Sequence, residues 1–383
     1  MSSETQSEEV PAMRQEVEIG SDGEKHKGRL LKVLHLPDWS SGNPYQNLLV
    51  ESLQQLGSQP VLADFPRGRF PLNRAVKQAA DVQVLHLHWI NDLIAPILWS
   101  KSSAARFAKL VLLAADVLLV RMRGISVVWT IHNMVAHETP DRSTELLARR
   151  VLSHVCTHVI LHSDRAKQRV EDAYRVKLSG KCTIIPHGNY DGCYPFSASR
   201  RLELQRQLGV DEQSVVILFF GAIRPYKGVR RLIEAFGLTS ALNLRLIVAG
   251  RPMTTQFGDE IISLAKQDRR VSVLLDFVVT EDVAALFSLA DAVALPFENT
   301  LTSGSVTLAQ TMGKPLLLPE EARVLGDTIS DCALFFDSRA ALVRTLSSLN
   351  RAQLITMGMS AKAHSDAMPW EKVAGLTDKV YRL

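Results

Sequence analysis

Short apolar runs alternate with amphipathic segments along most of the chain. In the first half, the apolar runs that predict buried strands are 31–36, 60–64, 82–89, 124–130 and 155–162, of which 60–64 is the weakest. Residues 45–56 and the segment after Ser163 have helical periodicity, and the Ser163 hydroxyl is a suitable N-cap. A strand, a glycine loop and a helix in that order are typical of the start of a doubly wound α/β domain with a parallel sheet.

The alternation pauses in a turn-rich stretch that contains Gly188, Gly192 and Pro195, and then begins again. The predicted strands of the second half are 215–220, 244–249, 271–275, 291–295 and 315–319. Thr280 is expected to cap the helix over 281–290. Because single cores stop growing at about 250–300 residues, a chain of 383 residues predicts two domains. The alternation of strands and helices on both sides of the turn-rich stretch predicts that these are two facing Rossmann-like domains with a cleft between them.

The composition is that of an ordinary globular protein, with 46% hydrophobic and 22% charged residues. A net charge of +4 gives no case for nucleic-acid binding, but it is compatible with weak attraction to an anionic membrane surface. The four cysteines form no CxxC pair, which argues against a zinc site or a disulfide framework and favours a cytoplasmic protein. Residues 1–28 are polar and acid-rich, and we expect them to form a disordered tail.

One apolar run, residues 107–120, needs a separate interpretation. Lys109 and Asp116 interrupt it, and it falls short of the ~20 apolar residues that a membrane-spanning helix needs. The run therefore predicts either a core helix or a helix that lies on a membrane surface, and the sequence leaves both alternatives open.

The stretch FFGAIRPYKGV, residues 219–229, joins a buried strand to a helix through a basic turn. A strand that breaks at Gly221 and opens into a helix presents free backbone N–H groups and a positive dipole end to an anion. Arg224 adds a planar two-pronged donor and Lys227 a point charge, which together suit a diphosphate. An ordinary strand-to-helix turn with solvated basic residues is the alternative.

A second loop in the same half has similar chemistry without the charge. Thr302, Ser303, Gly304 and Ser305 stand where a helix is expected to begin, and they supply hydroxyls and backbone N–H groups to a phosphate. Glu298 lies just upstream and can accept hydrogen bonds from sugar hydroxyls. The alternative is a simple N-cap beside a solvent-facing glutamate, and the presence of two such loops in one half weakens it.

Histidines lie where two predicted strands of the first half end. His86 and His88 end one strand, while His132 and Glu138 follow the next. Because ligands bind beyond the carboxyl ends of strands in open α/β sheets, these side chains predict the edge of a cleft. We expect His86 to be a core histidine with a backbone partner, and His88 to serve the site. Histidine can hold a hydroxyl or phosphate there or move a proton, whereas the spacing of His132 and His137 does not favour zinc.

These motifs together resemble those of bacterial glycosyltransferases of the GT-B fold, especially the family-4-like enzymes of exopolysaccharide synthesis. The resemblance covers most of residues 30–383, and it rests on SSGNPY, LHLHW, WTIHNMVAHE, IIPHGNY, FFGAIRPYKGV and TSGS followed by MGKP. It implies an acceptor-binding domain over 29–195 and a nucleotide-sugar-binding domain over 196–368. The terminal helix over 369–383 is similar to one that packs back toward the first domain in this fold.

The resemblance also assigns roles to single residues. It places Gly42, Arg224, Lys227, Thr302, Ser303, Gly304 and Ser305 around the nucleotide-sugar and His132 at the reacting face. The residue patterns described above add Gly221 and Glu298 to the nucleotide-sugar site, and His88 and Glu138 to the reacting face. No metal or other cofactor is expected, because the cations and helix ends can neutralise the leaving diphosphate.

The chain departs from the usual retaining members of this family, which carry two glutamates separated by seven residues. The partner of Glu298 would be Val306, or Leu308 in an alternative alignment, so the second glutamate is missing. This pattern is similar to a divergent branch that includes bacterial β-mannosyltransferases, and it leaves the stereochemistry open. If the reaction inverts, the candidate bases are Glu138, His132 and Asp92.

The resemblance thus implies transfer of a hexose from GDP-mannose or a UDP-sugar to a lipid-linked saccharide. It implies a cytoplasmic enzyme, with contact to the inner membrane as an open expectation. Two alternatives remain, a nucleotide-sugar epimerase of the same fold and an inactive sugar-nucleotide-binding partner subunit.

Overall fold

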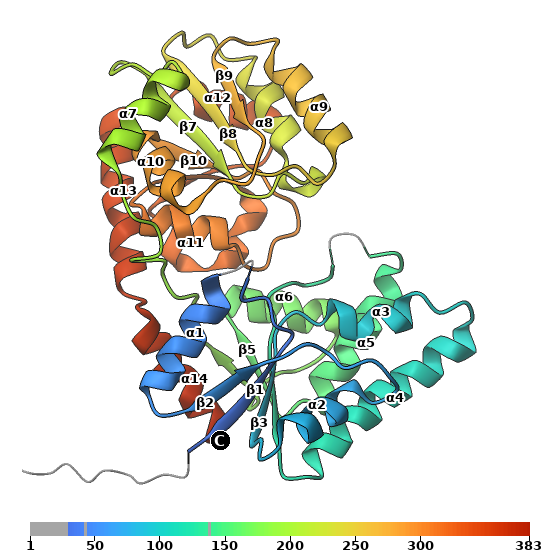
Figure 1. Cartoon of the computed structure of the whole chain (residues 1–383). Helices are drawn as coiled ribbons and strands as arrows, with labels where there is room; N and C mark the ends of the chain where they lie inside the picture. Colours follow the sequence, from blue (N-terminus) through green and yellow to red (C-terminus); the bar gives the residue numbers. More distant parts are fainter. Residues whose placement is uncertain (1–29, 42–43, 137–138) are drawn as a thin grey trace, which may run out of the picture.

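The computed structural model describes residues 30–41, 44–136 and 139–383. They form two α/β domains, with the N-terminal domain at the bottom of Figure 1 and the C-terminal domain at the top. The predicted tail 1–28 and two predicted site residues, Gly42 and Glu138, lie outside the described residues.

The N-terminal domain is built on a sheet of six parallel strands in the order β2-β1-β3-β4-β5-β6. Its strands are β1 Lys32–Leu36, β2 Gln59–Leu62, β3 Val84–Leu87, β4 Ser126–Thr130, β5 His158–Leu161 and β6 Cys182–Ile184. Its helices are α1 Pro44–Gln55, α2 Pro71–Ala79, α3 Asn91–Leu98, α4 Ser103–Arg121, α5 Arg142–Val155 and α6 Asp164–Tyr174. The four central strands are almost wholly buried, as expected of a parallel sheet with helices on both faces.

The C-terminal domain repeats this plan with the strand order β12-β11-β10-β7-β8-β9. Its strands are β7 Val215–Phe220, β8 Leu244–Ala249, β9 Val271–Leu274, β10 Ala292–Ala294, β11 Leu316–Pro319 and β12 Ala333–Phe336. Its helices are α7 Ala198–Gln207, α8 Val229–Phe236, α9 Thr255–Ala265, α10 Thr280–Leu289, α11 Gly304–Thr311, α12 Arg339–Ser347 and α13 Arg351–Asp366. Three short 3₁₀ helices are η1 Pro225–Lys227, η2 Glu320–Leu325 and η3 Asp327–Ile329.

The last helix, α14 (Trp370–Tyr381), leaves the C-terminal domain and packs against α1 of the N-terminal domain. Trp370, Val373 and Tyr381 join Leu49 in one buried apolar cluster of the N-terminal domain. The end of the chain therefore completes the core of the domain with which the fold begins.

Each sheet has one point where the strand order reverses. That point lies between β1 and β3 in the first sheet and between β7 and β10 in the second. Ligand-binding crevices form at such points, outside the carboxyl ends of the strands. The loop after β7 carries the basic turn and the loop after β10 carries residues 302–305, so the topology makes the two predicted phosphate loops neighbours.

The predicted fold class, two Rossmann-like doubly wound domains, is confirmed. Two predicted details are wrong. Helix α10 begins at Thr280 itself, and Val279 occupies the N-cap position without a side-chain hydrogen bond. The strand predicted over 155–162 begins only at His158, because α5 continues to Val155.

The apolar run 107–120 lies in α4, which packs on the core along one face only. Leu113 and Val117 are buried, whereas Phe107 and Val111 are exposed. In the described part of the chain, no helix is both long and apolar enough to cross a bilayer.

Candidate functional site

A cavity of about 480 Å³ lies between the two domains, lined by loops that follow the strands at both switch points. Its lining from the N-terminal domain is Trp39, Asn91, Asn133 and Ala136. Its lining from the C-terminal domain is Ala222, Arg224, Tyr226, Lys227, Phe297, Thr300, Thr302, Ser303, Gly304 and Ser305. The structure thus brings Arg224, Lys227 and residues 302–305 together in one place.

Gly221, which follows β7, allows the two predicted phosphate loops to approach each other. Its φ of +121° is one that residues with a side chain rarely adopt. A Cβ atom at this position would lie 2.9 Å from Ser305 Oγ and 3.3 Å from Lys227 Nζ. Because Gly221 has no Cβ, the Ser305 hydroxyl of one loop and the Lys227 ammonium group of the other can both lie close to its Cα.

Lys227 is half-buried, and no carboxylate pairs with its ammonium group among the described residues. Burial, and then the charge of Arg224, lowers the pKa of Lys227 to about 8. The group is charged at pH 7 in surroundings that disfavour its charge, and a bound anion would relieve this cost. Two neighbouring cations in a cavity therefore indicate an anionic ligand at this end of it.

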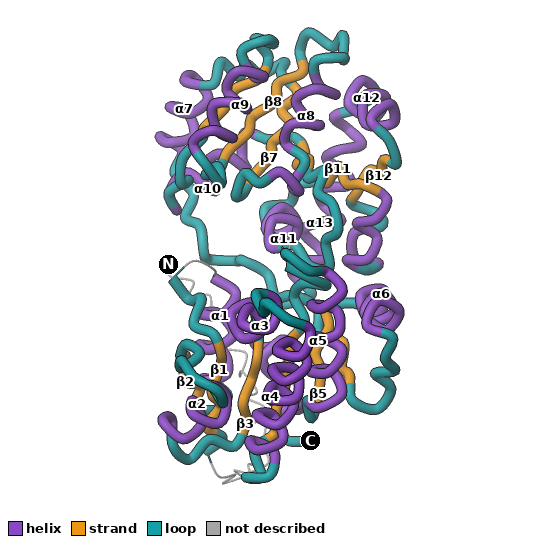
Figure 2. The backbone as a smooth tube through the Cα atoms, turned by 90° about the vertical axis from the view of Figure 1, so that its right-hand side faces the viewer, coloured by secondary structure: helices purple, strands orange, loops and turns teal. Residues whose placement is uncertain are grey.

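Helix α11 begins in the cavity wall, and Figure 2 shows it at the junction of the two domains. Ser303 is its N-cap, and the serine hydroxyl accepts a hydrogen bond from the Val306 amide at 3.3 Å. The Thr302 hydroxyl donates to the His132 carbonyl at 3.0 Å and so ties this loop to the N-terminal domain. The N-cap interpretation of Ser303 is confirmed. It leaves the serine proton and the positive helix end able to meet a phosphate.

Glu298 is not among the described residues that line this cavity. Its carboxylate forms an ion pair with Arg231 at 3.0 Å, and both side chains are about half exposed. Its backbone amide donates to the Tyr226 carbonyl at 2.8 Å, which links the loop after β10 to the basic turn. In this structure Glu298 braces the two loops, and its contact with a sugar hydroxyl stays a prediction.

Trp39 lines the N-terminal side of the cavity and is the first of three stacked rings. The rings of Trp39 and Trp89 are nearly parallel with centroids 4.8 Å apart, and Trp89 stacks on His132 at 4.5 Å. The Gln46 side chain fixes this loop, because its amide donates to the Pro37 carbonyl at 2.8 Å and accepts from the Trp39 amide at 2.7 Å. A flat ring face at the cavity suits the apolar face of a sugar or a base.

A buried ion pair on α5 supports the same wall from behind. Arg149 Nη2 lies 2.7 Å from Glu145 Oε1, and both side chains are almost fully buried. Arg149 donates to the Asn133 carbonyl at 2.9 Å and to the Asn91 amide oxygen at 3.3 Å. Glu145 accepts from the Ala136 amide at 2.7 Å. The pair therefore positions three residues of the cavity lining.

Behind the stacked rings, four histidines form a continuous chain of hydrogen bonds. His35 Nδ1 lies 3.0 Å from His88 Nε2, and His88 Nδ1 lies 3.3 Å from His132 Nε2. His132 Nδ1 lies 3.4 Å from His162 Nε2. The chain ends at the Ile185 carbonyl, 2.8 Å from His162 Nδ1.

The direction of this histidine chain follows from its last member, since a carbonyl oxygen can only accept a hydrogen bond. His162 therefore carries its proton on Nδ1. With neutral rings, each earlier histidine donates from Nδ1 to the Nε2 atom of the next, an assignment inferred from the network. His35 Nε2 is then left as a bare acceptor, and it is a buried atom without a hydrogen-bond partner among the described residues.

The four rings of the histidine chain are neutral at pH 7. Burial lowers the pKa of His35 to about 3 and the pKa of His162 to about 4. Burial, and then the neighbouring imidazoles, lower the pKa of His88 and His132 well below the ordinary value of 6.5. Neither His88 nor His132 is among the described residues that line the cavity, and both ring nitrogens of His132 lie in the chain. Their roles at the reacting face stay predictions.

His86 lies beside the histidine chain and has two side-chain partners. Its Nδ1 lies 2.6 Å from the Tyr381 hydroxyl, and its Nε2 lies 2.7 Å from Thr130 Oγ1. The expected core position is confirmed, but the expected backbone partner is wrong.

His35, His86 and His88 each offer a ring nitrogen within 4.8 Å of the others, a spacing that a metal ion can use. A metal would have to displace the hydrogen bonds that now hold these rings, so the arrangement fits a hydrogen-bonded core better.

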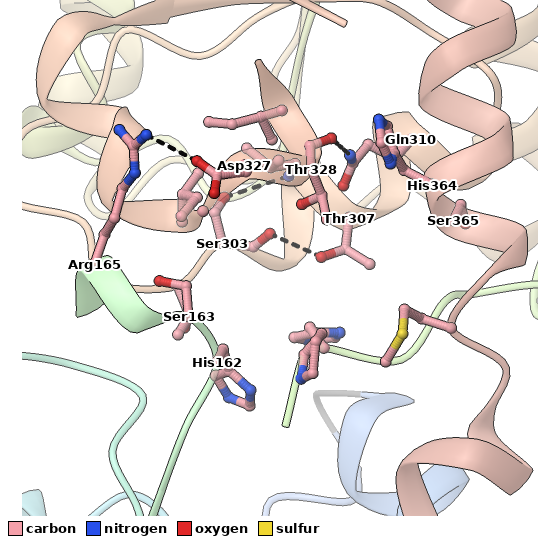
Figure 3. A pocket seen from close by; sticks show the side chains of 18 of the residues that line it. His162, Ser163, Arg165, Ser303, Thr307, Gln310, Asp327, Thr328, His364 and Ser365 are labelled. Atoms are coloured by element: carbon pink, nitrogen blue, oxygen red, sulfur yellow. Dashed lines mark hydrogen bonds and ion pairs between the residues drawn. The ribbon is translucent and has the colours of Figure 1, made fainter. Parts of the chain in front are cut away.

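A second interdomain cavity, of about 220 Å³, shares Thr302 and Ser303 with the first (Figure 3). Its further lining includes His162, Ser163, Arg165, Thr307, Gln310, Asp327, Thr328, His364 and Ser365. Arg165 pairs with Asp327 at 2.8 Å, and His364 Nε2 lies 2.7 Å from an Asp331 carboxylate oxygen. Arg165 and His364 thus face acidic partners, whereas Lys227 in the first cavity pairs with no carboxylate of the described residues, so we place the anion site in the first cavity.

Sequence reasoning missed several contributors to the site. Trp39 and Tyr226 line the cavity but were not named as site residues, although Tyr226 lies inside the stretch FFGAIRPYKGV and Trp39 directly precedes SSGNPY. The Glu145–Arg149 pair has helical i, i+4 spacing, which also describes many exposed pairs. Asp92, a candidate base, is exposed in the first turn of α3 and is not among the described lining residues.

Comparison with known proteins finds one family model that matches part of the chain and several relatives that are similar to it. The family described as "Glycosyl transferases group 1" matches residues 214–349. A GDP-mannose:glycolipid 4-beta-D-mannosyltransferase of Xanthomonas campestris pv. campestris is 28% identical over 281 residues, covering 72% of this chain and 70% of the relative. A D-inositol 3-phosphate glycosyltransferase of Corynebacterium aurimucosum is 24% identical over 362 residues, covering 88% and 79%.

Solved structures agree on the fold. Anabaena HepE in complex with UDP and glucose has a TM-score of 0.68 at 16% identity, and the match covers 92% of this chain and all of that one. The predicted resemblance to GT-B glycosyltransferases is confirmed by the family match, the relatives and the fold.

Proposed function

We propose that this chain, whose sequence and fold support a glycosyltransferase of the GT-B type, transfers mannose from GDP-mannose to a glycolipid acceptor. The observation that carries the proposal is the interdomain cavity in which Arg224, Lys227 and the start of α11 converge. The similarity to the Xanthomonas mannosyltransferase, whose donor is GDP-mannose, supports GDP-mannose over a UDP-sugar.

The C-terminal half of the cavity would hold the donor diphosphate. When the bond between the sugar C1 and the phosphate oxygen breaks, its electron pair stays on that oxygen and the leaving diphosphate gains negative charge. Arg224, Lys227 and the N–H groups at the start of α11 are fixed before the reaction and would stabilise that charge. Ser303 and Ser305 can donate hydroxyl protons to the same oxygens.

The N-terminal half would hold the acceptor and the mannose ring. Trp39 offers a ring face to a sugar, while Asn91 and Asn133 offer amide groups to its hydroxyls. A β-linked product from an α-linked donor requires inversion, in which the acceptor hydroxyl attacks C1 and gives its proton to a base. No described lining residue is a carboxylate or an imidazole, so Glu138, which follows Ala136 by two positions and lies outside the described residues, is the base we propose.

Thermal stabilisation by a panel of nucleotides tests the donor assignment, since a ligand of the folded state raises its melting temperature. We expect GDP and GDP-mannose to stabilise the protein more than UDP and its sugars. A shift with UDP-sugars alone would overturn the assignment of GDP-mannose.

Product analysis separates the proposed transfer from its rivals. We expect GDP to be released only when a glycolipid acceptor is present, and a chelator to leave the rate unchanged. Conversion of the donor without nucleotide release would indicate an epimerase. Tight donor binding without any conversion, across a panel of glycolipid acceptors, would indicate a sugar-nucleotide-binding partner subunit.

A further inference from the structure

Helix α4 carries an apolar stripe on the face that does not pack on the core. Phe107, Val111, Leu118 and Met122 fall within about 60° of arc at 100° per residue. All four are exposed, Phe107 at 70% and Met122 at 83%, and the stripe runs roughly 22 Å at 1.5 Å per residue. Monomeric proteins seldom expose a continuous apolar stripe unless something covers it.

A further exposed apolar side chain, Trp99, is the C-cap of α3 and stands four positions before α4 begins. Its side chain is 73% exposed, and residue 99 ends the helix whose first residue, Asn91, lines the first cavity. In Figure 1, α4 lies at the outer edge of the N-terminal domain, away from the C-terminal domain. We call Trp99, Phe107, Val111, Leu118 and Met122 the α4 surface.

The charged side chains between residues 99 and 123 are mostly basic, and one of them, Arg106, pairs with Asp141, the N-cap of α5, at 3.0 Å. Lys109 and Arg121 donate to backbone carbonyls, those of Pro96 and Val155, rather than to carboxylates. Arg123 donates to the Asn73 amide oxygen. The one acidic residue between 99 and 123 is Asp116, which is buried and accepts hydrogen bonds from the first backbone amides of α2. Positive charge beside the α4 surface is therefore not cancelled by acidic residues of its own segment.

We propose that the α4 surface docks on a bilayer that contains anionic lipids. An apolar stripe flanked by Lys and Arg, on a helix that an exposed Trp precedes in the chain, is the pattern of a helix that lies in the membrane interface. The complementary charge of the bilayer distinguishes this occupant from a second copy of the chain, whose matching surface would also be positive. The proposal deepens the proposed function, because α3 would then connect the membrane to the cavity that receives a lipid-linked acceptor.

Flotation with vesicles tests this docking without any need for turnover. We expect the full-length protein to bind phosphatidylglycerol-containing vesicles, to bind pure phosphatidylcholine vesicles weakly, and to dissociate as salt rises. The double variant Phe107→Ser with Met122→Ser should lose at least tenfold in binding. The matched control is Phe277→Ser, which removes an equally exposed ring (71%) from the C-terminal domain and should change nothing.

Three results would overturn the proposal. The first is equal loss of binding in the control variant, and the second is unchanged binding in the double variant. The third is a double variant that converts a dimer to a monomer with vesicle binding unaltered, since a second copy would then cover the surface. GDP-induced stabilisation, measured on the same samples, is expected to persist in every variant, so a failure of docking and a failure of the donor assignment remain distinguishable.

Discussion

Both halves of the first cavity are built from loops that follow parallel strands, but the two halves differ in the net charge of the side chains around them. On the N-terminal side, the described groups behind the cavity lining include the neutral histidine chain and the Glu145–Arg149 pair, whose charges balance each other. In the C-terminal domain, Lys227 keeps a positive charge that no described carboxylate balances.

The difference shows how one fold can serve two ligands. Under the proposed function, the neutral ring and amide groups of the N-terminal side would recognise the shape and hydroxyl positions of a sugar. The cationic turn beside the start of α11 would bind the diphosphate, which would relieve the cost of keeping the buried Lys227 charged.

Acid should destabilise the N-terminal side most. The buried histidines are neutral in the folded protein, with pKa values of about 3 for His35 and His187 and about 4 for His162, whereas unfolded histidine titrates near 6.5. Below pH 6.5 the unfolded state binds more protons, so the free energy of unfolding falls as pH decreases. Each such histidine contributes up to about 1.4 kcal/mol per pH unit.

Urea unfolding at pH 7.5, 6.5 and 5.5 measures this loss, and the slope against pH counts the protons taken up. A stability that stays flat over this range would show that the histidines are not neutral as a group.

Breaking the buried pair on α5 should have the next largest effect. Arg149→Met leaves the Glu145 carboxylate buried without its partner, and removal of one member of such a pair costs about 3–5 kcal/mol. Urea unfolding measures the loss. The double variant Glu145→Gln with Arg149→Met should regain part of it, and a single variant as stable as the parent would show that the pair is dispensable.

Removal of either cation should reduce catalysis more than it reduces stability. Arg224→Ala or Lys227→Ala should cut turnover at least ~100-fold, because one fixed stabiliser of the leaving diphosphate is lost. Release of GDP in the presence of acceptor measures the rate. Arg230→Ala removes an exposed arginine of α8 that pairs with Glu260, so it is the matched control. Full activity in the Arg224 and Lys227 variants would place the diphosphate elsewhere.

The smallest expected effect is a pH dependence of nucleotide affinity. Since the pKa of Lys227 is about 8 in the free protein and a bound diphosphate would raise it, affinity for GDP should be constant below pH 8. It should then fall up to tenfold per pH unit as the lysine loses its proton. Calorimetry between pH 7 and 9.5 measures the profile, and Lys227→Arg should flatten it. A flat profile in the parent protein would mean that Lys227 does not touch the nucleotide.

Much of the fold could be predicted, because the order of apolar and polar residues within each short segment indicates whether that segment forms a strand or a helix. The strands over 215–220 and 244–249 agree with the prediction at both ends, and Ser163 caps α6 as expected. The nearness of the basic turn to residues 302–305 also follows from local motifs once the strand order is known.

What could not be predicted depends on contacts between distant residues or on burial. The hydroxyl of Tyr381 forms a hydrogen bond with His86, which is 295 positions away in the sequence, and no local sequence pattern predicts that contact. The imidazoles of His88 and His132 follow strands, as expected of site residues, yet they hydrogen-bond to each other behind the wall. A glutamate such as Glu298 can equally reach a ligand or an arginine, and only the packing of the two loops decides between them.

The placement of α14 has a consequence for how the protein is made. The ribosome synthesises the N-terminal domain before the C-terminal domain, but the N-terminal core lacks Trp370, Val373 and Tyr381 until α14 has been translated. That core is therefore completed only after the C-terminal domain has been synthesised. Until then the half-built domain exposes apolar surface to the translation environment, where chaperones act.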